Sequence, residues 1–258
     1  AVPPVFAVAD GMGGHLGGAQ ASSTAVLILQ EYLSPGRLGD RPVDLVDLSV
    51  AIDSAATAVA SLAPADNPMS APGTTLSGLM VLHTAEGPYW LSFNVGDSRA
   101  YVVGGGGVRQ LTHDHSALQE ARDLAATSGA PRVIPPANVV TKALGAGQSG
   151  GVKADYTIMP LEEGDRAVIC TDGVHGVLSD SQMYALVAAG NGPQGDADAL
   201  VRAALEGGTR DNATAVVVYA GTESRVTLPS NVMSRMIQPV RPASIETARR
   251  IPRRKGSN

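Results

Sequence analysis

Three aspartates lie next to apolar, β-branched runs at distant points of the chain. Asp10 follows the strand-like run in VFAVADGMGGH, Asp172 follows AVICT, and Asp211 precedes ATAVVVY. A side chain at the end of a strand is held more rigidly than one on a loop. Carboxylates gathered in a dry core would repel one another unless a divalent cation lay between them. The sequence therefore predicts that these three aspartates share a divalent metal site.

A glycine-rich turn follows the first of these aspartates. It fits neither GxxxxGK[ST] nor GxGxxG in register, and no lysine follows it, so a nucleotide-binding loop is excluded. Its glycines would let a backbone carbonyl, such as that of Gly11, approach a cation closely. His15 stands directly after the turn and is a candidate proton donor, since an unperturbed histidine titrates near pH ~6.5. The alternative that His15 only caps or packs on the next helix stays open.

Two of the carboxylates also have simpler interpretations. Asp97, in NVGDSRAYVV, occupies a tight turn between two expected strands and could join the metal site or bond its own backbone. Asp211 could instead form a simple Asx-turn, and the pair Asp211–Asn212 alone is uninformative. Their spacing alone does not decide between these alternatives.

The elements that would position these residues follow from hydrophobic periodicity and turn signals. Helices are expected at 19–33, 44–62, 116–128, 179–189 and 196–206. Strands are expected at 5–9, 74–83, 89–95, 100–103, 108–111, 155–159, 166–171 and 213–219. A hairpin tip is expected at 104–107, a loop at 63–72 and a surface flap at 129–138. This order predicts an α+β sandwich of sheets covered by helices.

The composition is that of a globular protein. The chain has 258 residues, of which 44% are hydrophobic and 17% charged, and its aromatic content of 3% predicts a core of Ala, Val, Leu and Ile. The lone Cys170 lies inside an apolar run, which predicts a buried, inert thiol and a reducing compartment such as the cytoplasm. We expect no signal peptide and no membrane span, because no basic segment opens the chain and no apolar stretch is long enough.

Charge divides the chain in two. From Thr222 onward there are 8 basic and 2 acidic residues, whereas the rest holds 11 basic and 22 acidic residues. An acidic body argues against a nucleic-acid enzyme. We therefore expect one domain over residues 1–221 and a basic, disordered tail over 222–258, which could otherwise contact anionic lipid or RNA.

Seven motifs occur in the order found in one family. They are FAVADGMGGHLGG, GTTLSGLMV, FNVGDSRAYVV, LTHDHS, VVTKALG, RAVICTDGV and RDNATAVVV. Over about residues 5–220 the chain resembles the bacterial metal-dependent protein phosphatases of the protein phosphatase 2C (PPM) family. The resemblance implies a four-layer αββα sandwich of two mainly antiparallel sheets. It also implies hydrolysis of phosphoserine and phosphothreonine on proteins, through a water or hydroxide that bridges two Mn²⁺ or Mg²⁺ ions.

The resemblance also implies a role for each site residue. Asp10 matches the bridging ligand and Gly11 a carbonyl ligand of one ion, and Asp172 and Asp211 match ligands of the other. Asp97 matches a ligand of a third, looser ion that it shares with Asp172. Hard oxygen donors of this kind select Mg²⁺ or Mn²⁺ over Zn²⁺. His15 is the candidate to protonate the leaving seryl oxygen or to contact the substrate.

The resemblance assigns structural roles to the other histidines. In LTHDHS, His113 and His115 are expected to be structural, with Asp114 capping the helix that starts near Ser116. His83 and His175 are expected to be structural or exposed. The pair Val174–His175 is unusual for the family, and we expect it not to touch the ligand set.

The chain departs from the family pattern before Asp10. Family members usually carry an arginine that binds the substrate phosphate, followed by an Asn-Glu-Asp triplet, whereas nothing basic precedes Asp10 here. This predicts weaker substrate binding and an unpaired sheet edge. The alternative function is a non-catalytic phosphoprotein-binding or regulatory domain that keeps the fold and the metals. Expected partners are phosphorylated proteins and a serine/threonine kinase, and the chain is expected to be a monomer.

Overall fold

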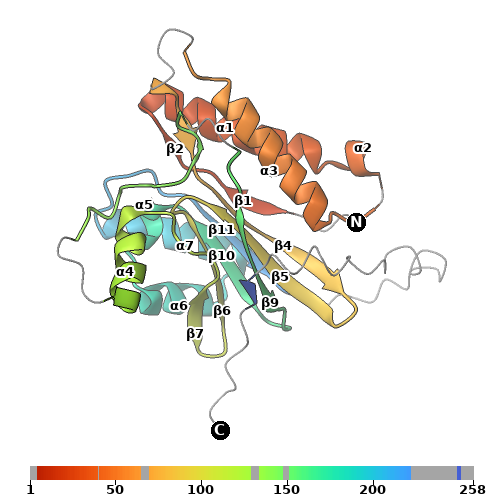
Figure 1. The fold of residues 1–258 in the computed structure, drawn as a ribbon. Helices are drawn as coiled ribbons and strands as arrows, with labels where there is room; N and C mark the ends of the chain where they lie inside the picture. Colours follow the sequence, from red (N-terminus) through yellow and green to blue (C-terminus); the bar gives the residue numbers. More distant parts are fainter. Residues whose placement is uncertain are drawn as a thin grey trace.

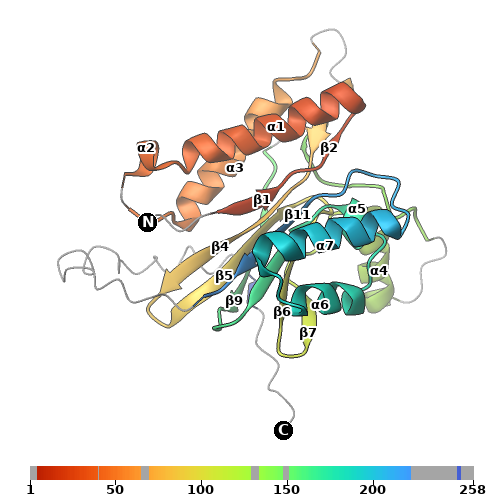
Figure 2. The ribbon, with the colours of Figure 1, turned by 180° about the vertical axis from the view of Figure 1, so that it is seen from behind.

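Two β-sheets pack face to face, and helices cover the outer face of each (Figures 1 and 2). The computed structural model describes residues 5–39, 41–64, 70–128, 134–147, 151–221 and 249–250. The first sheet has the order β1 (Phe6–Val8), β4 (Leu76–Thr84), β5 (Gly87–Val95), β9 (Asp155–Pro160) and β12 (Arg249–Arg250). The second has the order β11 (Ala215–Tyr219), β10 (Arg166–Cys170), β6 (Arg99–Gly104) and β7 (Gly107–Gln110).

Strand pairing is antiparallel throughout these sheets except between β12 and β9. Side chains of a strand alternate between its two faces, so β5 serves two cores. Leu91 and Phe93 pack in the core beneath the helices, whereas Trp90 lies in the core between the sheets. The alternation of residues along β5 therefore decides which of its faces packs against the helices and which packs against the second sheet.

Each sheet carries one pair of packed helices. The first sheet is covered by α1 (His15–Tyr32) and α3 (Leu45–Ala60), and the second by α6 (Asp180–Ala188) and α7 (Gly192–Glu206) (Figures 1 and 2). The other described helices are α2 (Pro35–Leu38), α4 (Ala117–Ser128) and α5 (Asp172–His175). Capping boxes start α3 and α6, where an N-cap side chain and an N3 side chain satisfy backbone N–H groups that would otherwise lack partners. The expected αββα sandwich is confirmed.

A third, small sheet was not expected from the sequence. It consists of β2 (Gly11–Met12), β3 (Gly73–Thr74) and β8 (Leu144–Gly145). The strand predicted over 74–83 is broken at Thr75, whose N–H donates to the Asp10 carbonyl at 2.8 Å. At Thr75 the chain passes from the small sheet into the first sheet, and the hydrogen bond made there holds the backbone of Asp10, two residues after β1.

The predicted cap of α4 was wrong. Ser116 accepts the N–H of Gln119 at 3.2 Å, whereas the Asp114 carboxylate pairs with the Arg99 guanidinium at 2.6 Å. Asp114 is 6% exposed, and a carboxylate buried to that degree requires a charged partner more than a helix requires a cap. The hairpin tip at Gly105 and Gly106 was predicted correctly, and both adopt positive φ angles.

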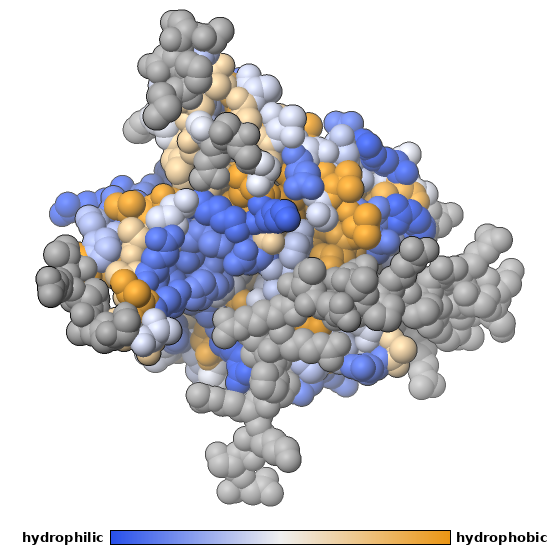
Figure 3. Space-filling view, viewed as in Figure 1, coloured by the Kyte–Doolittle hydropathy of each residue, from blue (hydrophilic) through white to orange (hydrophobic). Residues whose placement is uncertain are grey.

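Several expectations fall on residues outside those described. They concern the tail from Thr222, apart from Arg249–Arg250, together with the centre of the 63–72 loop and the first half of the flap. None of the described helices is long and apolar enough to cross a membrane. In the space-filling view of Figure 3, hydrophilic residues form a broad area on one face, and apolar residues appear beside it as separate patches.

Candidate metal centre

Asp10 lies between β1 and β2, and its backbone is bonded on both sides. Its N–H donates to the hydroxyl of Thr75 at 3.0 Å, and its carbonyl accepts from the Thr75 N–H and from the Thr74 hydroxyl. The Thr75 hydroxyl also lies 2.8 Å from that of Ser98, which follows Asp97. The first predicted ligand is therefore connected to the turn that carries the fourth.

Close backbone packing explains the glycine that follows Asp10. A Cβ on Gly11 would lie 1.9 Å from the carbonyl oxygen of Gly18 in α1. No side chain fits in that space, so β2 can approach α1 only with glycine at this position.

Asp172 and Asp211 are brought together by the pairing of β10 with β11. Asp172 is the first residue of α5, immediately after β10, and Asp211 precedes β11. The hydroxyl of Thr171 accepts the Thr214 N–H at 3.1 Å and donates to the Asn212 carbonyl at 3.3 Å, so the two loops are bonded to each other. Asp211 is exposed and accepts the N–H of the adjacent Asn212 at 2.8 Å, a local contact one residue shorter than that of an Asx-turn.

Asp97 is 7% exposed, in the turn that leads from β5 of the first sheet into β6 of the second. Gly96 has φ 105°, and a Cβ there would lie 2.6 Å from Cγ2 of Thr75. Its N–H donates to Nδ1 of His115 at 3.0 Å. The turn is therefore fixed by glycine geometry and by a histidine.

The carboxyls of Asp10, Asp97 and Asp172 have raised pKa values. Burial, followed by the charges of Asp172, Asp211 and Asp97, raises the pKa of Asp10 to about 7. Burial and the charge of Asp172 raise the pKa of Asp97 to about 6. Burial, followed by the charge of Asp211, also raises the pKa of Asp172, which shares a side-chain hydrogen bond with Asp10. These groups come from four separate segments and lie within electrostatic reach of one another.

The donor set suits a hard divalent cation. Oδ1 of Asp172 is buried and has no hydrogen-bond partner among the described residues, although a buried acceptor of this kind normally has one. A cation would satisfy it and would offset both the burial and the mutual repulsion that raise the three pKa values. No three acidic, histidine or cysteine side chains of the described residues surround a single point. The expected ions would therefore depend on few protein ligands each, as Mg²⁺ sites commonly do.

A buried charged cluster supports the Asp97 turn from the second sheet. Nε of Arg99 donates to the Asp114 carboxylate at 2.9 Å, and Nη1 donates to the Tyr101 hydroxyl at 3.2 Å. Gln110 donates to the same carboxylate at 3.0 Å. Because these four side chains satisfy one another, the base of β6 is held rigidly.

The expectation that His175 would not touch the ligand set was wrong. His175 ends α5, and its Nε2 lies 3.0 Å from the carbonyl oxygen of Asp97. Burial lowers the pKa of this imidazole to about 4, so the ring is neutral and donates its Nε2–H to the carbonyl. The sequence clue was its position three residues after Asp172, one helical turn away.

The other histidines divide into described and undescribed side chains. His15 begins α1, and its side chain lies outside the described set. His83 is exposed, and His113 pairs with Asp123 at 2.7 Å. His115 supports the Gly96 turn, as its predicted structural role requires.

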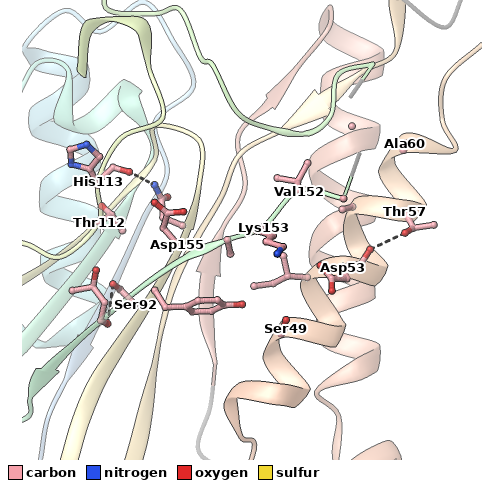
Figure 4. A pocket seen from close by; sticks show the side chains of 18 residues that line it. Ser49, Asp53, Thr57, Ala60, Ser92, Thr112, His113, Val152, Lys153 and Asp155 are labelled. Carbon is pink, nitrogen blue, oxygen red and sulfur yellow. Dashed lines mark hydrogen bonds between the residues drawn. The ribbon is translucent and has the colours of Figure 1, made fainter. Parts of the chain in front are cut away.

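A cleft of about 930 Å³ lies elsewhere in the fold. Figure 4 shows α3 on one side of it and residues of β9, together with Thr112 and His113, on the other. None of the four aspartates is among its described lining residues. The strand pairings instead place the four aspartates at one rim of the sandwich, where β1, β5 and β10 end and β11 begins.

Comparison with known proteins assigns the family. The family model described as Protein phosphatase 2C matches residues 3–202. The chain belongs to the protein phosphatase 2C family. Among members of the protein phosphatase 2C family, it is 28% identical over 218 residues to the serine/threonine phosphatase stp of Listeria innocua, covering 83% of this chain and 84% of that protein.

Solved structures of protein phosphatase 2C relatives share the architecture. The PPM Ser-Thr phosphatase MsPP of Mycobacterium smegmatis, solved with cacodylate, is 31% identical with a TM-score of 0.68, over 84% of this chain and 88% of that one. The catalytic domain of PstP, solved with two manganese ions, is 28% identical with a TM-score of 0.67, over 83% and 86%. The family resemblance found in the motifs is therefore confirmed.

Proposed function

We propose that the chain hydrolyses phosphoserine and phosphothreonine on proteins, using two Mn²⁺ or Mg²⁺ ions and possessing a site for a third. The observation that carries the proposal is the gathering of Asp10, Asp97, Asp172 and Asp211 at one rim, with raised pKa values at three of them and an unpartnered buried oxygen on Asp172. The structure of PstP with two manganese ions supports it.

Each residue has a proposed part in the reaction. Asp10 would contact both ions, and the Gly11 carbonyl would bind one of them. Asp172 and Asp211 would hold the second ion, and Asp97 together with Asp172 would hold the third. When bound, such ions supply a nucleophilic water at neutral pH and neutralise phosphate oxygens. Hydrogen bonds of the chain hold the segments that carry the carboxylates in place, and His15 protonates the leaving seryl oxygen.

No protein nucleophile is needed for this chemistry. Cys170 is fully buried, and burial raises the pKa of its thiol to about 12. A thiol in that state is neither exposed nor ionised at neutral pH. The proposed setting is the bacterial cytoplasm, where a monomeric phosphatase would reverse the action of serine/threonine kinases on phosphorylated proteins.

The test is hydrolysis of a phosphothreonine peptide with Mn²⁺, measured as released phosphate. Asp172→Asn should lower kcat by a factor of 10² or more, because it weakens the hold on an ion that neutralises transition-state charge. Asp198→Asn, an exposed residue of α7, is the matched control and should retain full activity. Turnover that survives both EDTA and Asp172→Asn would refute the metal mechanism.

The same assay separates the alternative function. A domain that binds a phosphoprotein without hydrolysing it, although Mn²⁺ fills its sites, would be a non-catalytic regulatory domain. The phosphatases among the relatives favour catalysis. Titration of phosphopeptide and of Mn²⁺ by calorimetry, beside the turnover assay, distinguishes the two.

A further inference from the structure

His175 joins two of the proposed ligand segments directly. It lies at the end of α5, the four-residue helix that begins with Asp172, and donates from Nε2 to the Asp97 carbonyl at 3.0 Å. The bonded residues are 78 positions apart in the chain. One side chain therefore connects the element that carries Asp172 to the peptide that carries Asp97.

The Asp97 turn has a second support, but it comes from a different element. Asp97 is also held through its neighbour Gly96, whose N–H donates to His115. His115 belongs to the loop before α4, however, and does not connect the turn to α5. Among the described residues, the hydrogen bond from His175 joins the Asp97 turn to α5.

Because α5 is short and tightly packed, the His175 hydrogen bond determines the distance between the Asp97 turn and Asp172. A one-turn helix has little freedom to stretch, and Gly173 within it is pressed against Asn212, where a Cβ would lie 2.2 Å from the carbonyl oxygen. The position of α5 is therefore fixed on one side by the loop that carries Asp211. The His175 bond then sets how far the Asp97 turn stands from Asp172.

We propose that His175 is a positioning residue that holds the Asp97 and Asp172 carboxylates at the separation needed to share one divalent ion. The inference rests on the proposed function, because it concerns an ion of the proposed site. It requires a hydrogen-bond donor at the position of the imidazole Nε2. It predicts that losing the donor weakens the ion shared by these two aspartates more than it weakens the rest of the site.

The experiment is calorimetric titration of the EDTA-stripped full chain with Mn²⁺, comparing wild type with His175→Leu, His175→Gln and His175→Asn. Leucine fills the space without a donor and should raise the dissociation constant of the weakest Mn²⁺ site about 10- to 100-fold, the usual effect of losing support for a ligand. Glutamine carries an amide nitrogen at the reach of Nε2 and should stay within about threefold of wild type. Asparagine is too short to reach the carbonyl and should behave like leucine.

Two controls make the result specific. His83→Leu alters an exposed histidine and should leave Mn²⁺ binding unchanged. In an Asp97→Ala background, His175→Leu should cause no further loss, because the carboxylate that it positions is absent. At saturating Mn²⁺, kcat of His175→Leu on the phosphothreonine peptide should recover towards wild type.

The proposal is overturned if folded His175→Leu binds Mn²⁺ as wild type does, or if its loss persists undiminished with Asp97→Ala. If His175→Leu fails to fold, the pair Gln and Asn decides, and equal affinity in these two variants overturns it. A wild type that binds Mn²⁺ without releasing phosphate would refute the proposed function while leaving the His175 test intact. A wild type that binds no Mn²⁺ overturns both.

Discussion

Asp97→Asn should stabilise the metal-free protein against unfolding and reduce the further stabilisation that Mn²⁺ provides. Burial and the charge of Asp172 raise the Asp97 pKa from 3.8 to about 6. The folded state therefore binds the proton of the Asp97 carboxyl more tightly than the unfolded state does. The stability that the protonated form contributes is complete below pH 3.8 and is lost as the pH rises through about 6.

The size of the effect follows from that difference. At about 1.4 kcal/mol per pH unit, ionising Asp97 costs the folded state on the order of 2 to 3 kcal/mol at pH 7.5. Asparagine has nearly the same shape and cannot ionise, so the variant avoids this cost. With EDTA present, Asp97→Asn should be more stable than wild type by about that amount at pH 7.5 and by only about 0.5 kcal/mol near pH 4.

The assay is urea unfolding followed by tryptophan fluorescence. Trp90 is the one tryptophan of the chain, it is 1% exposed, and it donates to Asp165 at 2.9 Å, so its emission reports the core between the sheets. Adding Mn²⁺ at pH 7.5 should stabilise wild type more than the variant and narrow or reverse their order. Equal stability without metal at pH 7.5, or a difference that is the same at pH 4, would refute the reasoning.

Three further changes test separate parts of the structure. Gly11→Ala should destabilise the fold by more than about 3 kcal/mol in urea unfolding, because the added Cβ meets backbone atoms. Gly36→Ala should change the free energy of unfolding by less than about 0.5 kcal/mol, because the space around Gly36 is open. Equal effects of the two substitutions would contradict the packing described. Asp114→Asn should cost about 2 to 4 kcal/mol of stability, since it leaves the partly buried guanidinium of Arg99 without a charged partner. Arg41→Met, which removes the ion pair with Asp47 near the surface, should cost about 0 to 1 kcal/mol by the same measurement. Cys170 should resist alkylation by iodoacetamide at pH 8 and react on unfolding, as followed by mass spectrometry; rapid native labelling would contradict its burial.

Much of the fold could be predicted from periodicity, because burial imposes it. The apolar spacing of α3 and the alternation along β5 each indicate an element and its buried face. Two-residue strands such as β2 and β3 carry no periodicity, and their pairing depends on contacts between residues more than sixty positions apart. Asp114 also misled the sequence interpretation, because an aspartate before a helix suggests a cap while its burial depends on Arg99.

The candidate site divides in the same way. Motifs identified the four aspartates, since each stands beside a recognisable strand and turn. The contact between Thr75 and Ser98 carries no local signal, because the two residues are near only after folding. His175 has one local clue, its position one helical turn after Asp172, but its contact with Asp97 is also formed only on folding. Their contacts with the ligand segments are a consequence of tertiary structure.

The positions of the four aspartates also bear on how the protein unfolds. Asp10 follows a strand of the first sheet, Asp172 and Asp211 adjoin strands of the second, and Asp97 lies on the segment that crosses between them. An ion held by these groups would join both sheets at one rim of the sandwich. Separating the sheets from that end would require releasing the ion first, so cation binding would slow unfolding and protect the chain from proteolysis. The same metal site that serves hydrolysis would then also determine how long the chain stays folded.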